Sequence, residues 1–295
     1  MAEDAFDDQY EGCAEDIEKM APQLLKEELE NSPEMKTEWE AAKKEREGKK
    51  NKIKYSEQFN DFHGTALVAY TGSIAVEFNK AVRNFHQNTH GFQFKAFHYY
   101  LMRALQLLGT GQCYTVYRGC KTKFHDTGSR PVRFGQFTSS SFSKDVALGF
   151  SGGYGTVFTI QTCLGVAIEK FSFFPHEKEV LIPGYEVYQK VTKQSNNNIL
   201  LQSPQKSQSN VNCFYTSAGM KESSLLLLLL PGLLVLLLLP AELEPHCRGL
   251  SAPPGLTRDA KGRIWWLTHI RCTEMIGTQA PMCDLSLQPS SLFGD

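Results

Sequence analysis

Two glutamates, Glu177 and Glu179, stand two positions apart, directly before a short aliphatic run at 180–182. A short apolar run next to turn residues is typical of a buried strand. In extended backbone, residues two apart point to the same face, so the two carboxylates are predicted to converge. Paired acids suit chemistry at a sugar carbon, where positive charge builds as a glycosidic bond breaks. The ordinary alternative is a solvated turn, on which charged triplets are common.

Two other segments carry residue types that fit such a reaction. Arg118 ends a β-rich run at 113–119, and Ser139 opens a run of three serines that follows residues 134–137. The planar fork of an arginine can bind a phosphate through two hydrogen bonds, and the neighbouring Gly119 lets other backbone approach closely. Each feature also has an ordinary explanation, a surface arginine that closes a strand and a serine run that forms a loop.

Composition sets wide limits on the function. The 295 residues are 41% hydrophobic, enough for one large domain or two modest ones with a core. A net charge of −1 gives no field that would attract nucleic acid or an anionic membrane. The chain lacks a Cys-x-x-Cys pair and its histidines are scattered, so a metal site is not expected. It also lacks a Gly-x-Gly-x-x-Gly run, which excludes dinucleotide binding of the Rossmann type.

The pattern of apolar residues divides the chain into a helical part and a strand-rich part. The region 63–74 is ambiguous between a helix and a buried extended element, and 196–209 is predicted to be a polar loop. Helices first and strands later indicate the α+β class. We expect helices at 14–30, 33–49, 77–85, 92–108 and 143–150, and strands at 113–119, 132–139, 156–162, 166–173, 179–182 and 186–192.

Arg118, Ser139 and Glu179, in this order, resemble the arginine–serine–glutamate triad of the ADP-ribosyltransferases. The chain is identified as a member of the vertebrate arginine-specific ecto-mono-ADP-ribosyltransferases and is most similar to their T-cell surface branch. The likeness is collinear over roughly the first 220 residues, which predicts a catalytic domain at 1–220. It rests on the segments 6–13, 69–71, 113–119, 134–141, 162–165, 177–187 and Cys213.

The resemblance implies a fold and an activity. The fold would be an N-terminal helical half followed by a mixed β-sandwich core of the ADP-ribosyltransferase type. The activity would be transfer of ADP-ribose from NAD to arginine side chains of proteins, with release of nicotinamide. NAD would be a consumed substrate, so no cofactor is expected. The partners would be NAD and target proteins, without nucleic acid.

The resemblance also assigns roles to residues. Arg118 would bind the pyrophosphate, Ser139 would bind the nicotinamide ribose, and Glu179 would stabilise the oxocarbenium-like state. Glu177 would orient the acceptor guanidinium and accept its proton. Phe150 fits a nicotinamide contact or the core equally well. The expected NAD-binding residues are Tyr70, Arg118, Gly119, Gln136, Ser139, Phe150 and Ser172.

Two other functions remain open on the same scaffold. One is an NAD glycohydrolase, in which water captures the reaction intermediate. Relatives with glutamine at the position of Glu177 mainly hydrolyse NAD, so the glutamate here favours transfer. The other is a surface antigen or interaction module that retains the fold without catalysis. The complete set of Arg118, Ser139, Glu177 and Glu179 argues against this loss.

The eight cysteines fit either reduced cytosolic thiols or an oxidised secreted framework. The resemblance selects the oxidised framework and implies two disulfides, Cys13–Cys213 and Cys113–Cys163. It assigns no pairing to the remaining four, which are Cys120, Cys247, Cys272 and Cys283.

Both ends of the chain depart from the family pattern. Relatives have a cleaved secretory signal, whereas the first eight residues here are acidic and lack an apolar stretch. Relatives often end in a lipid-anchor signal, and 221–240 resembles one because small residues at 217–219 precede the apolar run 225–239. The residues 241–295 then form an atypical tail that we expect to be disordered. We therefore expect alternative termini, and a protein that is lipid-anchored at the cell surface or secreted.

Overall fold

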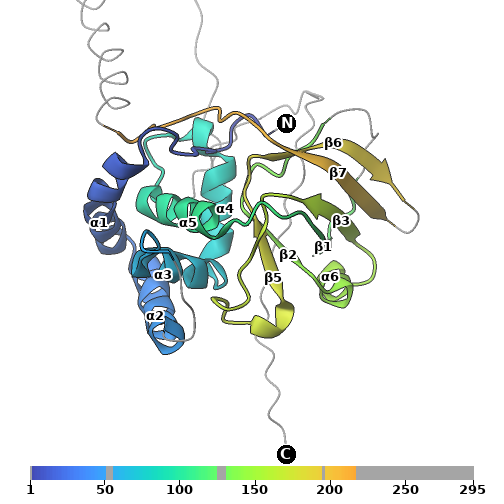
Figure 1. Ribbon diagram of the computed structural model, residues 1–295, viewed down its shortest axis with the longest axis horizontal. Helices are drawn as coiled ribbons and strands as arrows, with labels where there is room; N and C mark the ends of the chain where they lie inside the picture. Colours follow the sequence, from blue (N-terminus) through green and yellow to red (C-terminus); the bar gives the residue numbers. More distant parts are fainter. Residues whose placement is uncertain (1, 51–55, 125–130, 195–196, 217–295) are drawn as a thin grey trace, which may run out of the picture. The chain divides into compact units, whose positions relative to one another are not determined.

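The computed structural model describes residues 2–50, 56–124, 131–194 and 197–216. Within this part of the chain, helices come first and strands follow, as Figure 1 shows. The predicted α+β class is therefore confirmed. The segments 221–240 and 241–295 lie outside the described residues, as do Cys247, Cys272 and Cys283.

Five α-helices precede the first strand within the described residues. They are α1 (Ala14–Asn31), α2 (Pro33–Lys49), α3 (Asp61–Tyr70), α4 (Ile74–Arg83) and α5 (Lys95–Leu108), with a short 3₁₀ turn, η2 (Phe85–Gln87), after α4. The ambiguous region 63–74 is therefore helical, and residues 71–73 separate α3 from α4. Asn60 and His63 cap the start of α3 reciprocally. The Asn60 side chain accepts a hydrogen bond from the backbone N–H of His63 at 3.2 Å, and the His63 ring accepts one from the backbone N–H of Asn60.

A buried glutamate of α1 caps the N-terminus of α5. Glu28 accepts hydrogen bonds from the backbone N–H groups of Ala96 at 2.8 Å and Phe97 at 3.3 Å. The residue at the normal capping position, Phe94, cannot supply this bond, so the cap comes from another helix. Burial raises the pKa of Glu28 to about 8. This contact fixes α5 against α1 by satisfying donors that would otherwise be buried without partners.

The strands form one mixed sheet in the order β4-β5-β2-β1-β3-β7-β6. Neighbouring strands are antiparallel, except that β3 and β7 are parallel. Helix α6 (Lys144–Ser151) lies between β2 and β3 in the sequence. The strands are β1 (Tyr114–Cys120), β2 (Thr138–Ser141), β3 (Thr156–Thr162), β4 (Val166–Ala167), β5 (Glu179–Ile182), β6 (Glu186–Lys193) and β7 (Asn198–Lys206).

Three predictions of local structure differ from the fold. The predicted polar loop 196–209 is wrong, because it contains β7, in which Ile199 and Leu201 alternate with more exposed residues. The predicted strand 166–173 is regular only at Val166–Ala167. The predicted strand 132–139 begins only at Thr138, and Val132 instead makes an isolated bridge to Tyr188. Long-range pairing decided each case, and local composition does not report it.

Both faces of the sheet are covered by apolar side chains. In β5, Leu181 belongs to the core shared with the helices, whereas Val180 and Ile182 belong to a second core made by the strands. The second core includes β5 near one end of the strand order and Tyr188 of β6 at the other end. One continuous sheet therefore encloses a core of its own, which gives the predicted sandwich character.

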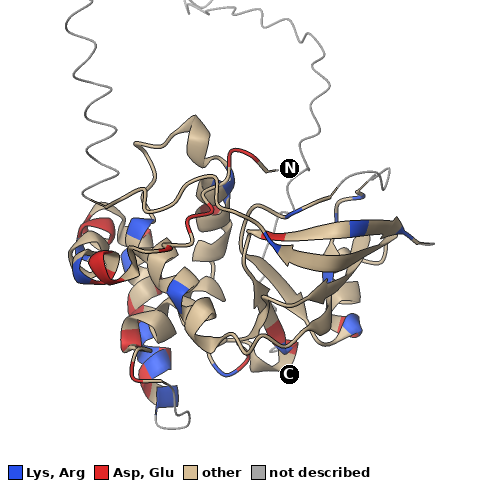
Figure 2. Cartoon of the chain, turned by 45° about the horizontal axis from the view of Figure 1, so that its top comes forward, with Lys and Arg blue, Asp and Glu red and all other residues tan. Residues whose placement is uncertain are grey.

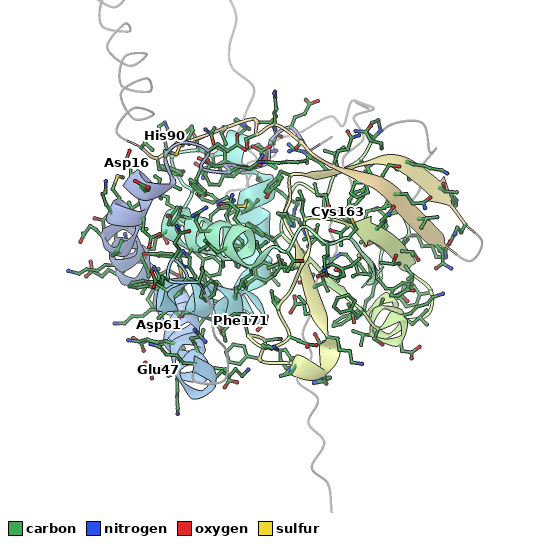
Figure 3. All side chains as sticks on the ribbon, in the orientation of Figure 1. Asp16, Glu47, Asp61, His90, Cys163 and Phe171 are labelled. Atoms are coloured by element: carbon green, nitrogen blue, oxygen red, sulfur yellow. A yellow bond between two sulfur atoms is a disulfide. The ribbon has the colours of Figure 1, made fainter. Side chains whose placement is uncertain are left out.

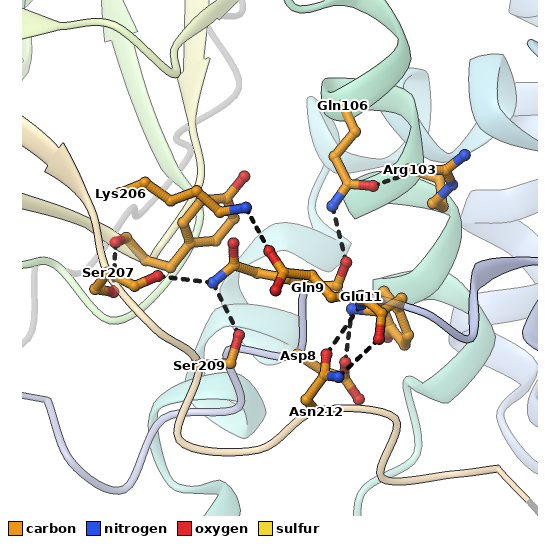
Figure 4. A network of polar contacts seen from close by, with 11 residues as sticks. Asp8, Gln9, Glu11, Arg103, Gln106, Lys206, Ser207, Ser209 and Asn212 are labelled. Carbon is orange, nitrogen blue, oxygen red and sulfur yellow. Dashed lines mark hydrogen bonds and ion pairs between the residues drawn. The ribbon is translucent and has the colours of Figure 1, made fainter.

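The N-terminal segment is fastened to the end of the domain by polar contacts (Figure 4). The Gln106 side chain of α5 donates to the Gln9 carbonyl at 2.9 Å. The Gln9 side chain donates to the Ser207 carbonyl at 2.9 Å and to the Ser209 hydroxyl at 2.8 Å. The two bonds of the Gln9 side chain connect residues 198 and 200 positions apart, so both ends of the domain must be in place before the network closes.

Two disulfides strengthen this arrangement. Cys13 is bonded to Cys213 and Cys113 to Cys163, the two pairs that the family resemblance implied. The first joins the start of α1 to the segment after β7. The second joins the residue before β1 to the residue after β3. The predicted oxidised framework is thus present in the described residues.

Charge is spread evenly over the helical surface. In Figure 2, acidic and basic residues are interspersed along α1 and α2, in agreement with the net charge of −1. In the part of the chain that the structure describes, no helix is both long and apolar enough to cross a bilayer.

We expect the two disulfides to stabilise the fold unequally. They close loops with sequence separations of 200 and 50 residues. In the loop-entropy model, these separations correspond to about 5 and about 4 kcal/mol, strain aside. Replacement of Cys13 and Cys213 by serine should therefore lower the free energy of unfolding more than replacement of Cys113 and Cys163, as measured by urea denaturation. A reversed order would contradict the entropic account, and free thiols in non-reducing peptide maps would contradict the pairing.

Candidate active site

A pocket lies where the first helices meet the sheet. Its empty space is about 750 Å³, a volume that includes the open mouth. Its walls come from the turn between α3 and α4, from β1 and β2, from α6 and from the segment before β5. The sequence-predicted residues that line it are Tyr70, Arg118, Gly119, Ser139, Phe150, Glu177 and Glu179.

Arg118 lies in the middle of β1 with its side chain buried. Its guanidinium Nη1 donates to the Ser139 carbonyl at 2.6 Å, which ties β1 to the neighbouring strand β2 through a side chain. Burial lowers the pKa of Arg118, while Tyr70 and Glu179 raise it. The guanidinium remains charged because an arginine cannot be deprotonated in a protein at working pH. Its charge is therefore available to an anion in the pocket.

Glu179 begins β5 and is only 7% exposed. Burial raises the pKa of its carboxyl to about 7. A hydrogen bond with the Ser139 side chain and the charge of Arg118 act in the opposite direction, whereas Glu177 adds to the rise. A carboxyl with this pKa is balanced between its two protonation states near neutral pH, which is common for catalytic groups.

The backbone at Glu177 differs from the prediction. Glu177 ends a 3₁₀ turn, η3 (Pro175–Glu177), and Lys178 has a left-handed conformation with φ 49°. The expectation of extended backbone is therefore wrong, although both glutamates do line the same pocket. Pro175 favours the turn because its φ is fixed. Glu177 itself is half-buried, and this burial raises the pKa of its carboxyl.

The second and third serines of the run have roles that the sequence did not reveal. The Ser140 hydroxyl donates to the Val180 carbonyl at 2.7 Å, and the Ser141 hydroxyl donates to the Glu177 carbonyl at 2.6 Å. The backbone N–H of Phe142 also donates to the Lys178 carbonyl at 3.2 Å. The strand that carries Ser139 thus holds the segment that carries both glutamates. The sequence pattern that could have predicted these bonds is the run of three consecutive hydroxyl residues.

Gly119 and Phe150 connect the pocket with α6. A Cβ at Gly119 would lie 1.7 Å from the Ala147 carbonyl oxygen, so a glycine is needed for α6 to pack against β1. Phe150 is 37% exposed and lines the pocket together with Val146, which lies one helical turn earlier. The choice between core and pocket for Phe150 is thereby resolved in favour of the pocket.

Two predicted NAD contacts, Gln136 and Ser172, are not among the residues that line this pocket. Gln136 accepts a hydrogen bond from Arg83. Ser172 is fully buried, and its hydroxyl accepts from the backbone N–H of Phe174 at 2.9 Å. Its carbonyl accepts from Lys49 of α2 at 2.6 Å. Figure 3 labels the preceding residue, Phe171, where this segment runs between α3 and β5.

Among the described residues, no cluster of three or more His, Cys, Asp or Glu side chains could hold an ion. The residues of the pocket combine one cation, two carboxylates, hydroxyls and two exposed aromatic rings, those of Phe150 and Phe174.

Comparison with known proteins identifies the family. Residues 1–209 match the family model of the NAD:arginine ADP-ribosyltransferases. The chain belongs to this family. Its catalysed reaction is therefore mono-ADP-ribosylation, with NAD as the consumed substrate.

The chain is also similar to individual members of the family. The T-cell ecto-ADP-ribosyltransferase 1 of Rattus norvegicus is 59% identical over 245 residues, which cover 82% of this chain and 89% of that protein. The T-cell ecto-ADP-ribosyltransferase 2 of Mus musculus is 54% identical over 261 residues, with coverages of 82% and 90%. A mutant of the eukaryotic mono-ADP-ribosyltransferase ART2.2, crystallised with NADH, is 58% identical over 73% of this chain and 98% of that one, with a TM-score of 0.71. Another ART2.2 mutant was solved in complex with NAD and has the same TM-score of 0.71.

Replacement of Gly119 by alanine should displace α6 and damage the pocket. The added Cβ collides with backbone rather than with a flexible side chain, so the helix must move. We expect a fall in nicotinamide release of at least ~10-fold, because misplacement by about 1 Å can cost 10²-fold in rate. Gly149→Ala is the matched control, because Gly149 lies in α6 itself and a Cβ added there would have no atom within 4 Å. Equal activity of both variants would contradict a packing role for Gly119.

The raised pKa of Glu179 predicts opposite pH trends for activity and stability. In the catalytic role that the resemblance implies for Glu179, nicotinamide release would need the carboxylate form, so the rate should fall as the pH drops through about 7. The folded state binds this proton more tightly than the unfolded state, so the stabilising contribution is lost as the pH rises through the same value. Initial rates and melting temperatures between pH 5 and 9 would show both trends. A rate that stays constant down to pH 5 would exclude Glu179 as the controlling group.

Proposed function

We propose that this enzyme transfers ADP-ribose from NAD to arginine side chains of proteins. The observation that carries the proposal is the position of Glu177, which lines the same pocket as Glu179 but is half-buried rather than buried. One carboxylate is thus placed for the sugar, and another is placed for a group that enters from solution. The family description, which names arginine, supports this division.

The buried residues would serve the donor. Arg118 would bind the pyrophosphate of NAD, with Gly119 beside it, and Ser139 would bind the nicotinamide ribose. Glu179 would stabilise the positive charge that develops on the ribose as the glycosidic bond breaks. Nicotinamide leaves with the bonding electron pair. Phe150, exposed in the pocket, would stack on the nicotinamide ring.

Glu177 would serve the acceptor. Its carboxylate would pair with the incoming guanidinium and turn one nitrogen towards the ribose carbon. As the new bond forms from that nitrogen, its proton passes to Glu177 and then to solvent. Partial burial raises the pKa of Glu177 and so makes it a better proton acceptor. A protonated guanidinium is a poor nucleophile without this help.

Hydrolysis of NAD is the second candidate. The pocket has an open mouth, so water can reach the ribose carbon when no guanidinium is bound. Both outcomes share the cleavage step and differ only in the group that captures the sugar. Nicotinamide release with and without the arginine analogue agmatine would measure the ratio between them.

We also propose an extracellular location for a catalytic domain at 1–220. The two disulfides support it, because such bonds persist in oxidising compartments. The similar proteins are named as ecto-enzymes, which agrees with this location. The apolar segment 221–240 would then act as a lipid-anchor signal, ahead of an atypical tail at 241–295.

Glu179→Gln should abolish nicotinamide release and transfer together. The substitution keeps the shape of the side chain and removes the charge, and loss of one preorganised electrostatic group can lower the rate by ~10²–10³. Both products should be quantified with labelled NAD, and circular dichroism should show that the fold is intact. Substantial turnover by a folded Glu179→Gln variant would remove Glu179 from the mechanism.

Glu177→Gln should separate the two activities. Without its charge, the acceptor guanidinium is unpaired and poorly oriented, so transfer to agmatine should collapse. Cleavage depends on Arg118, Ser139 and Glu179, so glycohydrolase activity should survive. The assay needs one protein, labelled NAD and two product readouts. Parallel loss of both activities in a folded protein would show that Glu177 works on the donor.

A further inference from the structure

Tyr70 joins two helices to the strand that carries Ser139. It is the last residue of α3, it is 2% exposed, and its ring forms part of the pocket wall. Its hydroxyl donates to the Phe137 carbonyl at 2.9 Å and accepts from the Asn79 side chain of α4 at 2.9 Å. The hydroxyl thus has a defined direction, with its one proton on a backbone oxygen.

The position of the Phe137 carbonyl affects the position of Ser139. Phe137 directly precedes β2, and two residues later the Ser139 carbonyl accepts from the Arg118 guanidinium at 2.6 Å. The Ser139 side chain interacts with both Tyr70 and Glu179. A shift of the peptide at Phe137 would therefore move the contacts of Ser139 with Arg118 and Glu179 at the same time.

The polar groups behind Tyr70 are buried at some cost. Asn79 is 4% exposed, and its Oδ1 has no hydrogen-bond partner among the described residues. A half-satisfied buried amide destabilises a core, so its presence here points to a role other than packing. Burial raises the pKa of Tyr70 to about 12, which keeps its hydroxyl protonated and able to donate at any working pH.

We propose that Tyr70 is a positioning residue: its hydroxyl, oriented by Asn79, fixes the Phe137 carbonyl and thereby sets Ser139 against Arg118 and Glu179. This role differs from contact with NAD, which was the expectation from the sequence. It concerns the cleavage of NAD, so it holds whether arginine or water captures the sugar.

The test begins with Tyr70→Phe, which keeps the ring in the pocket wall and deletes the hydroxyl. We expect kcat for nicotinamide release to fall by about 10-fold or more, since small misplacements of catalytic groups are expensive in rate. KM for NAD should change by less than about 3-fold, because the wall of the pocket is kept. Hydrolysis and transfer to agmatine should fall in parallel.

Tyr99→Phe is the matched control. Tyr99 is also a buried tyrosine, 1% exposed, whose hydroxyl lies within hydrogen-bond distance of the Ala14 carbonyl at 2.8 Å and of the Glu18 carboxylate at 2.6 Å. It belongs to α5 and is not part of the pocket wall. Its loss should lower the melting temperature by an amount comparable to that of Tyr70→Phe, while kcat stays unchanged.

A double variant separates stability from position. Tyr70→Phe leaves the Asn79 amide without its acceptor, and Asn79→Leu then removes that buried polar group as well. The double variant should regain part of the melting temperature and none of the lost kcat. Recovery of kcat together with the melting temperature would show a purely structural role and overturn the proposal. A raised KM with unchanged kcat would overturn it too, because Tyr70 would then be an NAD contact.

Discussion

The hydrogen bond from the Arg118 guanidinium to the Ser139 carbonyl is the contact on which the site depends. It joins the central strand β1 to β2 through a side chain, so the cation of the pocket cannot move independently of the serine. The next two residues of β2 extend this connection to the glutamates. Ser140 and Ser141 bind the backbone of the segment with the two glutamates, and so the same short strand positions all four polar groups.

Such a site needs a rigid surrounding, because it keeps charged groups away from water. Arg118 and Glu179 are both buried. Burial lowers the pKa of Arg118 and raises the pKa of Glu179, so it favours the neutral form of each. The opposite charges of the two residues and the Ser139 side chain offset part of this effect. The fold supplies the rigidity through contacts that are long in sequence, including the Glu28 cap of α5 and the Cys13–Cys213 disulfide. Pocket geometry and global stability are therefore coupled.

The two glutamates illustrate how one local sequence can provide two chemical environments. Glu177 ends the turn η3, and the left-handed Lys178 lies between the two acids, so Glu179 enters the sheet while Glu177 stays near the surface. The buried acid suits a substrate that must be desolvated, and the half-buried acid suits a partner that arrives from solution. A single extended strand would have given both acids the same burial.

The sequence by itself determined the α+β class, the family, the two disulfide pairs and the polar residues that meet in the pocket. The class depends on local periodicity, which can be read along the chain, whereas the disulfide pairs and the site residues were implied by the family resemblance. The tertiary structure alone decided which neighbours those residues have. It made β7 a strand through pairing with β3 and β6, and it left Gln136 and Ser172 out of the set of residues that line the pocket. It also gave Ser140, Ser141 and Tyr70 their partners. Strand pairing and burial join residues far apart in sequence, so no local pattern specifies them.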